Sequence, residues 1–258
     1  MLTLLAESKT MTTHQSPVSA EALKLHIPAF EDMADDIMSY LESLPVPDLA
    51  EALGISGSLA VKAHALAYDF PHKQTGCDAL HAFTGDAYRG LDINSVPEEL
   101  CATADSSLRI ISSVYGVLKP SDIIKPYRCE FNKPISSDHK TAIQLFRQPV
   151  TVYIVNLIKE RKTADIIDLL PADADKCIDW KIVRAFAKVH KVVFQSMMPD
   201  GRLKTPIAKR LKELRGTMYR EILTKGISSF QELTEVKSEA FIFSPADSKP
   251  GLPVFITD

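Results

Sequence analysis

The chain has few cysteines and no arrangement of cysteine or histidine that is typical of a metal site. Only four of its 258 residues are cysteines, and none belongs to a C-x-x-C pair: Cys77, Cys101, Cys129 and Cys177. The seven histidines include no pair spaced to bind a metal from one face of a helix. This scarcity argues against a structural zinc site, a haem site and a disulfide scaffold. We expect no metal and no cofactor, and a reducing cytoplasmic environment.

Long apolar runs and the common nucleotide-binding and hydrolase motifs are also missing. No stretch approaches the length of a membrane span, and the amino terminus has no basic region followed by a long apolar one. We therefore expect a soluble intracellular protein without a membrane partner. The sequence contains no P-loop, no dinucleotide-binding glycine fingerprint and no nucleophile elbow. A formal net charge of -3 excludes a uniformly basic coat protein, so nucleic acid would have to bind a local patch.

The most informative segment present spans residues 108–128. An apolar run ends there at Tyr115-Gly116, and two Lys-Pro steps follow. A proline moves the residue before it out of the α region, so Lys119 and Lys125 are expected on extended or turn backbone. The segment carries four cations and two tyrosines: Arg109, Lys119, Lys125, Arg128, Tyr115 and Tyr127. The pattern suits phosphate recognition, although turn residues beside a buried strand would give the same pattern.

A second basic segment, residues 207–223, has the spacing of an amphipathic helix. Lys212, Arg215 and Tyr219 fall on one face of this helix by the three-and-four rule. Gly216 lies within this helix. A glycine inside a helix costs about 1 kcal/mol of stability relative to alanine, so its presence indicates that a backbone or a ligand approaches the helix closely at this position. A solvated basic face is the alternative interpretation.

Two short helices joined by a glycine-containing turn are predicted within residues 35–68. The turn contains Gly54, Ile55, Ser56 and Gly57. In a helix-hairpin-helix, such glycines let the backbone approach a phosphate, which the amino-terminal amides of the second helix then bind. A plain helical hairpin, with the glycines as caps, explains the spacing equally well.

Five segments together resemble the YaaA family of bacterial peroxide-stress proteins. Residues 83–91 match F-x-G-D-x-Y-x-G-L, and residues 108–131 follow L-R-x-L-S-x-x-Y-G-x-L-x-P-x-D-x-x-x-P-Y-R-x-E-M closely. Residues 211–220 agree with A-K-x-A-R-G-x-M-x-R at the lysine, both arginines, the glycine and the methionine. The opening resembles the family's S-P-A-K-T-L at Lys9 and Thr10, and the turn shares I-S-x-x-L-A.

The chain departs from this family pattern in two places. Ala6-Glu7 replaces the family's Ser-Pro, and residues 168–174 lack the serine and the tyrosine of N-L-A-S-x-E-Y. We expect an altered site if these residues line the cleft.

The order of predicted elements and the resemblance together give a fold prediction. Strands and helices do not alternate strictly, which favours α+β over a doubly wound sheet. The resemblance implies a single YaaA-type domain over residues 1–258, with a mixed central sheet wrapped by helices and a helix-hairpin-helix-like element. Both chain ends are predicted as strands, and we expect them to pair within one sheet.

The resemblance also implies a function. Relatives limit peroxide damage by holding down free intracellular iron, and they bind DNA in a positive cleft. We therefore expect a DNA-binding protein with little sequence specificity. The predicted nucleic-acid-binding residues are Lys9, Arg89, Arg109, Tyr115, Lys119, Lys125, Tyr127, Arg128, Lys212, Arg215 and Arg220. Most of these cations are expected to converge on one cleft, with Tyr115 and Tyr127 as its walls.

Two alternatives remain open on the sequence. One is an enzyme acting on a nucleobase, nucleotide or abasic sugar, with Lys9 as the amine nucleophile and Asp86 or Asp122 as acid or base. The other is a partner-binding stress protein that contacts no nucleic acid. The sequence does not determine the oligomeric state.

Overall fold

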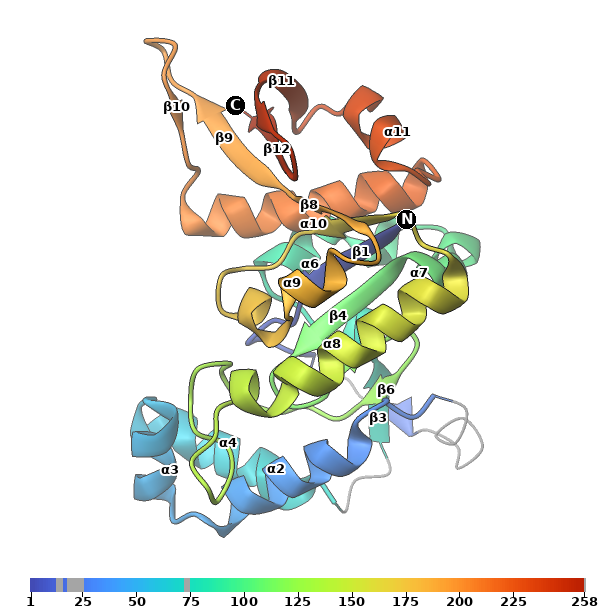
Figure 1. Ribbon diagram of the computed structural model, residues 1–258. Helices are drawn as coiled ribbons and strands as arrows, with labels where there is room; N and C mark the ends of the chain where they lie inside the picture. Colours follow the sequence, from blue (N-terminus) through green and yellow to red (C-terminus); the bar gives the residue numbers. More distant parts are fainter. Residues whose placement is uncertain (13–15, 18–25, 72–74, 258) are drawn as a thin grey trace.

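A five-stranded mixed sheet forms the centre of the molecule in the computed structural model, which describes residues 1–12, 16–17, 26–71 and 75–257 (Figure 1). The strand order is β5-β4-β1-β7-β8. The strands are β1 (Leu2–Ala6), β4 (Leu108–Ser112), β5 (Gly116–Leu118), β7 (Asp165–Asp168) and β8 (Lys188–Lys191). Only β5 runs antiparallel to its neighbour. The fold is therefore the mixed α+β type with a mixed central sheet that the sequence predicts.

The central position of β1 explains its composition. Thr3 lies opposite Leu108 on one side and opposite Ile167 on the other, and every residue of β1 and β4 is buried. A parallel strand covered on both faces requires a continuous apolar run instead of an alternating one. The first strand thus lies in the middle of the core.

The connections leave a crevice at the carboxyl ends of β1 and β7. The chain passes from β1 to β4 on one side, and it reaches β7 on the other side of β1 only after helix α8 (Ala142–Arg161). The next connection, from β7 to β8, leads away from β1. Adjacent strands whose connections run in opposite directions leave a ligand-sized crevice beyond their carboxyl ends. That crevice opens just after Ala6 and Asp168.

Helices cover this sheet. Helices α7 (Glu98–Ser107) and α10 (Ala208–Thr224) both contact β1, and α8 contacts β5. Thr141 begins α8 with a capping box, in which its side chain accepts the amide of Gln144 and Gln144 accepts the amide of Thr141. No described helix is both long enough and apolar enough to cross a bilayer.

The predicted hairpin consists of α3 (Val46–Leu53) and α4 (Gly57–Asp69), which lie with α2 (Glu31–Ser43) at the lower end of the molecule in Figure 1. Gly54 ends α3 with a φ of 64°, in the left-handed region that favours glycine. Its amide and that of Ile55 donate to the carbonyls of Glu51 and Ala50. The paired-helix geometry is therefore present, and whether it binds DNA stays a prediction.

A second sheet corrects one expectation about the chain ends. Its strands follow the order β10-β9-β12-β11 and comprise β9 (Val193–Met197), β10 (Leu203–Lys204), β11 (Ile242–Lys249) and β12 (Leu252–Thr257). The terminal strands β1 and β12 thus lie in different sheets, so the prediction that they pair was wrong. Both edges of β1 are occupied by β4 and β7, which leaves β12 to pair with β9 and β11.

Short elements complete the described chain: β2 (Ser16–Pro17), β3 (Thr75–Asp78), α5 (Ala79–Ala82), α6 (Asp86–Leu91), η1 (Ile93–Ser95), β6 (Ile123–Ile124), η2 (Ala174–Cys177), α9 (Trp180–Val183) and α11 (Phe230–Glu235). Buried apolar residues of both larger sheets form one contiguous cluster. The assignment of a single domain stays a prediction.

Candidate functional site

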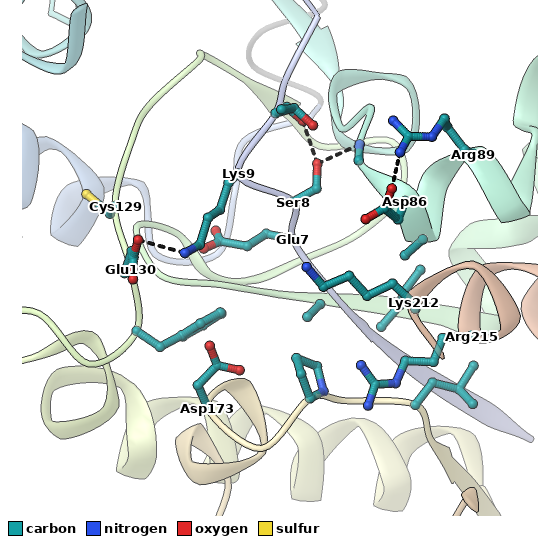
Figure 2. Close-up of a pocket in the computed structure, with 18 residues that line it drawn as sticks. Glu7, Ser8, Lys9, Asp86, Arg89, Cys129, Glu130, Asp173, Lys212 and Arg215 are labelled. Atoms are coloured by element: carbon teal, nitrogen blue, oxygen red, sulfur yellow. Dashed lines mark hydrogen bonds and ion pairs between the residues drawn. The ribbon is translucent and has the colours of Figure 1, made fainter. Parts of the chain in front are cut away.

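A cavity of about 340 Å³ opens at the crevice beyond β1 and β7 (Figure 2). Five segments supply its walls: the end of β1 with the chain after it, the start of α6, the loop after Arg128, the chain after β7, and helix α10. Its lining residues are Leu5, Ala6, Glu7, Ser8, Lys9, Thr10, Gly85, Asp86, Ala87, Arg89, Cys129, Glu130, Phe131, Leu169, Pro171, Asp173, Lys212 and Arg215. We refer to it as the switch-point pocket.

The chain after β1 is fixed by Ser8. Its hydroxyl accepts the amide of Gly85 at 3.0 Å and donates to the carbonyl of Thr10 at 2.5 Å. A side chain at Gly85 would place its Cβ 2.6 Å from that of Ser8. The glycine therefore permits this contact, which joins the segment after β1 to the start of α6.

Lys9 forms the outer part of one pocket wall. Its Nζ donates to Oε1 of Glu130 at 2.7 Å, and its carbonyl accepts Nη1 of Arg128 at 3.1 Å. The Lys9 side chain is 56 % exposed. Glu130 thus neutralises the ammonium group at the pocket mouth.

Glu7 lies deeper and is held by three donors. The amide and hydroxyl of Ser113 donate to its carboxylate at 2.9 and 2.6 Å, and the Tyr127 hydroxyl donates to the same group. The Tyr127 hydroxyl also shares a hydrogen bond with Ser112. Loss of solvent raises the pKa of Glu7 above its usual value, and the hydrogen bonds of Ser113 and Tyr127 oppose this rise. The pocket floor therefore contains an acid that the fold holds in place.

Helix α10 supplies the cations of the opposite wall, and it can do so because two glycines let it cross α6. A Cβ at Gly216 would lie 1.6 Å from the carbonyl oxygen of Ala87, and one at Gly90 would lie 2.1 Å from that of Glu213. The Gly216 prediction of a close backbone approach is thereby explained as helix–helix contact. The crossing directs Lys212 and Arg215 toward the pocket centre (Figure 2).

Arg215 is largely desolvated, and burial lowers the pKa of its guanidinium group. The carboxylates of Asp168 and Asp173 attract it only from a distance. Neither Arg215 nor Lys212 has a hydrogen-bond or ion-pair partner for its side chain within the described residues. By contrast, Arg89 pairs with Asp86 of its own helix. The α10 wall is therefore the pocket's source of unpaired positive charge.

The departures from the family pattern do line the pocket. Ala6 and Glu7 form part of its floor, while Pro171 and Asp173 belong to the segment after β7. Asp173 accepts the amide of Ala174 at 3.0 Å at the start of η2. Residues of both departures therefore line the pocket, and whether they alter the site stays a prediction.

The structure brings together some of the predicted site residues. Lys9, Asp86, Arg89, Lys212 and Arg215 line the switch-point pocket. Arg128 lies next to it through its bond to Lys9, and Tyr127 lies beneath it through Glu7. Tyr219, predicted on the same face as Lys212, is fully buried and shares a hydrogen bond with Ser107.

Other predicted residues lie elsewhere, so full convergence of the cations was wrong. Arg109 is 1 % exposed and donates to Tyr153 and to two carbonyls. Its burial leaves it no access to a ligand. Arg220 donates to the carbonyls of Leu91 and Asp92, outside the pocket.

The Lys-Pro segment serves the core. Lys119 lies 3.8 Å from buried Asp122, whose Oδ2 accepts the Lys119 amide, as expected of a turn. Lys125 lies over the Phe70 ring at 5.0 Å, and its amide donates to the hydroxyl of buried Tyr115. Tyr115 is therefore not a pocket wall, and Asp122 is not placed to act on a ligand in the pocket.

Sequence reasoning missed Glu7, Glu130 and Asp173. Glu130 matches the glutamate of the long central pattern, which was a usable signal. Glu7 lies within the first departure, where it replaces the proline of the family pattern, and Asp173 lies within the second, where it stands at the position of the pattern's glutamate. Among the described residues, no group of three or more histidines, cysteines or acids is placed to hold a metal ion, and the four cysteines are free thiols.

Comparison with known proteins agrees with the motif pattern. A family described as peroxide stress protein YaaA matches residues 1–247. A UPF0246 protein of Shewanella woodyi is 29 % identical over 259 residues, covering 99 % of this chain and 98 % of its own. UPF0246 proteins of Shewanella loihica and Salinispora tropica are each 27 % identical, covering 100 % and 99 % of this chain and 99 % and 94 % of their own. The family name supports a stress-related role, and the chain belongs to the YaaA family of peroxide stress proteins.

Proposed function

We propose that the protein is a cytoplasmic DNA-binding protein of the peroxide stress response, which contacts phosphate groups through the switch-point pocket. One observation carries the DNA contact: Lys212 and Arg215 face the pocket, and the side chain of neither forms a hydrogen bond or an ion pair within the described part of the chain. Asp168 and Asp173 act on Arg215 only from a distance. A desolvated, unpaired cation is costly to keep unless an anion binds it. Phosphate, like carboxylate, is an anion that a guanidinium group binds with two parallel hydrogen bonds.

Binding of this kind recognises phosphate groups and not the sequence of bases. Affinity should fall steeply as salt rises, because counterions released from DNA supply much of the binding free energy. Contacts limited to phosphates fix the position of the strand and give little sequence specificity.

The α3–α4 hairpin is proposed as a second contact. Gly57 and Ser58 are exposed at the amino terminus of α4, and, apart from the neighbouring residues of the helix itself, no atom lies within 4 Å of the position that a Gly57 Cβ would occupy. The Lys133 ammonium group lies beside Gly54, in the same loop that carries Glu130 into the pocket. One loop therefore connects the hairpin turn with the pocket wall, and a bound strand could touch both.

Limitation of iron-driven damage is the part of the proposal that rests on the family alone. It can be tested in cells that lack the protein, by measuring survival in peroxide and free iron after complementation with the wild type and with pocket variants. Restoration by the double variant Lys212→Ala/Arg215→Ala would separate the iron role from phosphate binding.

The DNA contact is tested by fluorescence anisotropy with a labelled bubble-containing duplex at 50 and 200 mM salt. We expect binding at 50 mM that weakens at 200 mM, and at least tenfold weaker binding for Lys212→Ala/Arg215→Ala. The matched control is Lys188→Ala/Arg202→Ala, which removes the same charge from exposed positions outside the pocket. Absence of binding at 50 mM, or equal loss in both double variants, would refute the proposal.

A second candidate function arises because Lys9 shares the pocket with two carboxyl groups, Glu7 and Glu130. An amine beside proton-transfer groups can form a Schiff base with an aldehyde, such as that of an abasic sugar. Borohydride reduction in the presence of abasic-site DNA would trap a covalent adduct that Lys9→Ala abolishes. Without an adduct, this candidate is excluded.

A further inference from the structure

We propose that the switch-point pocket binds a terminal phosphate monoester, carried either by a free mononucleotide or by the end of a nucleic-acid strand. The inference deepens the proposed function and rests on it in one respect, since both assign phosphate recognition to Lys212 and Arg215. It adds which phosphate is accepted and where the rest of the ligand lies.

The size of the pocket favours a single nucleotide. A cavity of about 340 Å³ lies at the small end of the range for small-ligand sites. Its floor consists of Leu5, Ala6 and Glu7 at the end of the central strand. A strand end or a mononucleotide can enter such a recess, whereas the middle of a duplex can only pass over its mouth.

The charges in the pocket are separated between its two sides. Figure 2 shows Lys212 and Arg215 reaching in from α10, with Lys9, Glu130 and Asp173 on the far side. The Lys9 charge is taken up by Glu130 at 2.7 Å, so the far side offers acceptor oxygens and little net positive charge. Glu7 adds another carboxyl group at the floor.

This polarity selects one kind of phosphate. A nucleic-acid backbone continuing through the pocket would bring further negative charges against the Asp173 carboxylate, and like charges repel. A terminal nucleotide instead presents one doubly charged group to the two unpaired cations. Its sugar hydroxyls and base then face the carboxylates, which accept hydrogen bonds from them.

The geometry of Arg215 supports its role as the principal phosphate ligand. Its guanidinium group is largely out of solvent, and no described residue accepts a hydrogen bond from it. A planar group with five donors matches two phosphate oxygens at once. Lys212 lies three residues earlier on α10 and is more exposed, which suits the outer phosphate oxygen.

Isothermal titration calorimetry in phosphate-free buffer at 50 mM salt can test the inference on the full-length protein. The small probes are deoxyadenosine 5′-monophosphate, deoxyadenosine and inorganic phosphate. The strand probes are two single-stranded 12-mers of one sequence, one with a 5′-phosphate and one with a 5′-hydroxyl. We expect the monophosphate to bind at least tenfold more tightly than the nucleoside, and the phosphorylated strand at least tenfold more tightly than the hydroxyl strand.

Variants assign the contact to the two cations. Lys212→Ala removes an exposed side chain and leaves the fold intact, so it remains informative if Arg215→Gln folds poorly. Each of these two variants should weaken binding of the monophosphate at least tenfold and leave binding of the nucleoside unchanged. Lys188→Ala should change the affinity for neither ligand. If Lys188→Ala and Lys212→Ala lost equal affinity for the monophosphate, the effect would come from net charge alone and the inference would be overturned.

The outcomes also separate this inference from the DNA-binding proposal. Equal affinity for the two strands, with binding of the bubble-containing duplex, would overturn the inference and leave the proposed function standing. Binding of the monophosphate without binding of any strand would support the inference for free nucleotides and refute DNA binding. If neither the small probes, the strands nor the duplex bound, both the inference and the DNA-binding proposal would be refuted.

Discussion

Gly216 of α10 and Ala87 of α6 are in direct backbone contact, because a Cβ at Gly216 would lie 1.6 Å from the Ala87 carbonyl oxygen. Gly90 makes the reciprocal approach to Glu213. The contact fixes the angle at which α10 presents Lys212 and Arg215 to the pocket. A helix–helix packing constraint and a candidate binding site are therefore set by the same two glycines.

Gly216→Ala should destabilise the protein although alanine is the better helix former. The gain in helix propensity is about 1 kcal/mol, whereas separating two packed helices costs about 1 to 3 kcal/mol and moves both pocket cations. Urea denaturation would measure the loss. Gly57→Ala is the control, since no atom lies within 4 Å of its would-be Cβ, and it should be neutral or stabilising. An unchanged midpoint for Gly216→Ala would contradict the contact.

Glu7 and Tyr127 should be energetically coupled. Glu7→Ala leaves the Ser113 amide and the Tyr127 hydroxyl without their acceptor, which should cost about 1 to 3 kcal/mol. Glu7→Gln keeps an acceptor oxygen and should cost less. A double-mutant cycle of Glu7→Ala with Tyr127→Phe, measured by urea unfolding, should give a coupling of about 1 kcal/mol or more. Additive effects would show that the hydrogen bond contributes little.

Asp122 should make stability depend on pH in the mildly acidic range. Burial raises its pKa from 3.8 to about 6, and its Oδ1 accepts no hydrogen bond within the described structure. Since the folded-state pKa lies above the unfolded one, the folded state binds the proton more tightly. Stability contributed by this group is complete below about pH 4 and is lost as pH rises through about 6.

Asp122→Asn keeps an acceptor for the Lys119 amide and removes this titration. The variant should therefore gain stability at pH 7, by up to roughly 3 kcal/mol from a shift of about two pKa units. It should also show a smaller fall in unfolding free energy between pH 4 and 7. Asp36→Asn, at an exposed position, should retain the wild-type pH profile. If the unfolding free energy of Asp122→Asn depended on pH in the same way as that of the wild type, Asp122 would not be the buried group that titrates.

Arg215→Met should stabilise the ligand-free protein by on the order of 1 kcal/mol, because it removes a desolvated charge that no described residue pairs. The same substitution at Arg210, whose Nη1 lies 4.0 Å from Glu213, should give no such gain. Thermal unfolding in phosphate-free buffer would compare them. A lower melting temperature for Arg215→Met than for Arg210→Met would mean that Arg215 serves the fold.

The sequence by itself determined the class of fold, the helical hairpin and the basic helix α10. These depend on local information: buried strands read as apolar runs, a left-handed glycine ends a helix, and apolar residues recur at helical spacing. It also determined the family, since the matched patterns cover the chain from Lys9 to Arg220. Lys9, Asp86, Arg89, Lys212 and Arg215 were therefore predictable as site candidates.

Only the tertiary structure decided which cations are available to a ligand. Arg109 and Lys125 look the same in the sequence as Arg215, yet one is used by Tyr153 and main-chain carbonyls and the other lies over Phe70. The pairing of the terminal strands was equally hidden, because strand partners are chosen by the edges that remain free. The pocket itself arises where β1 and β7 send the chain in opposite directions, and that depends on strand order, which no local pattern records.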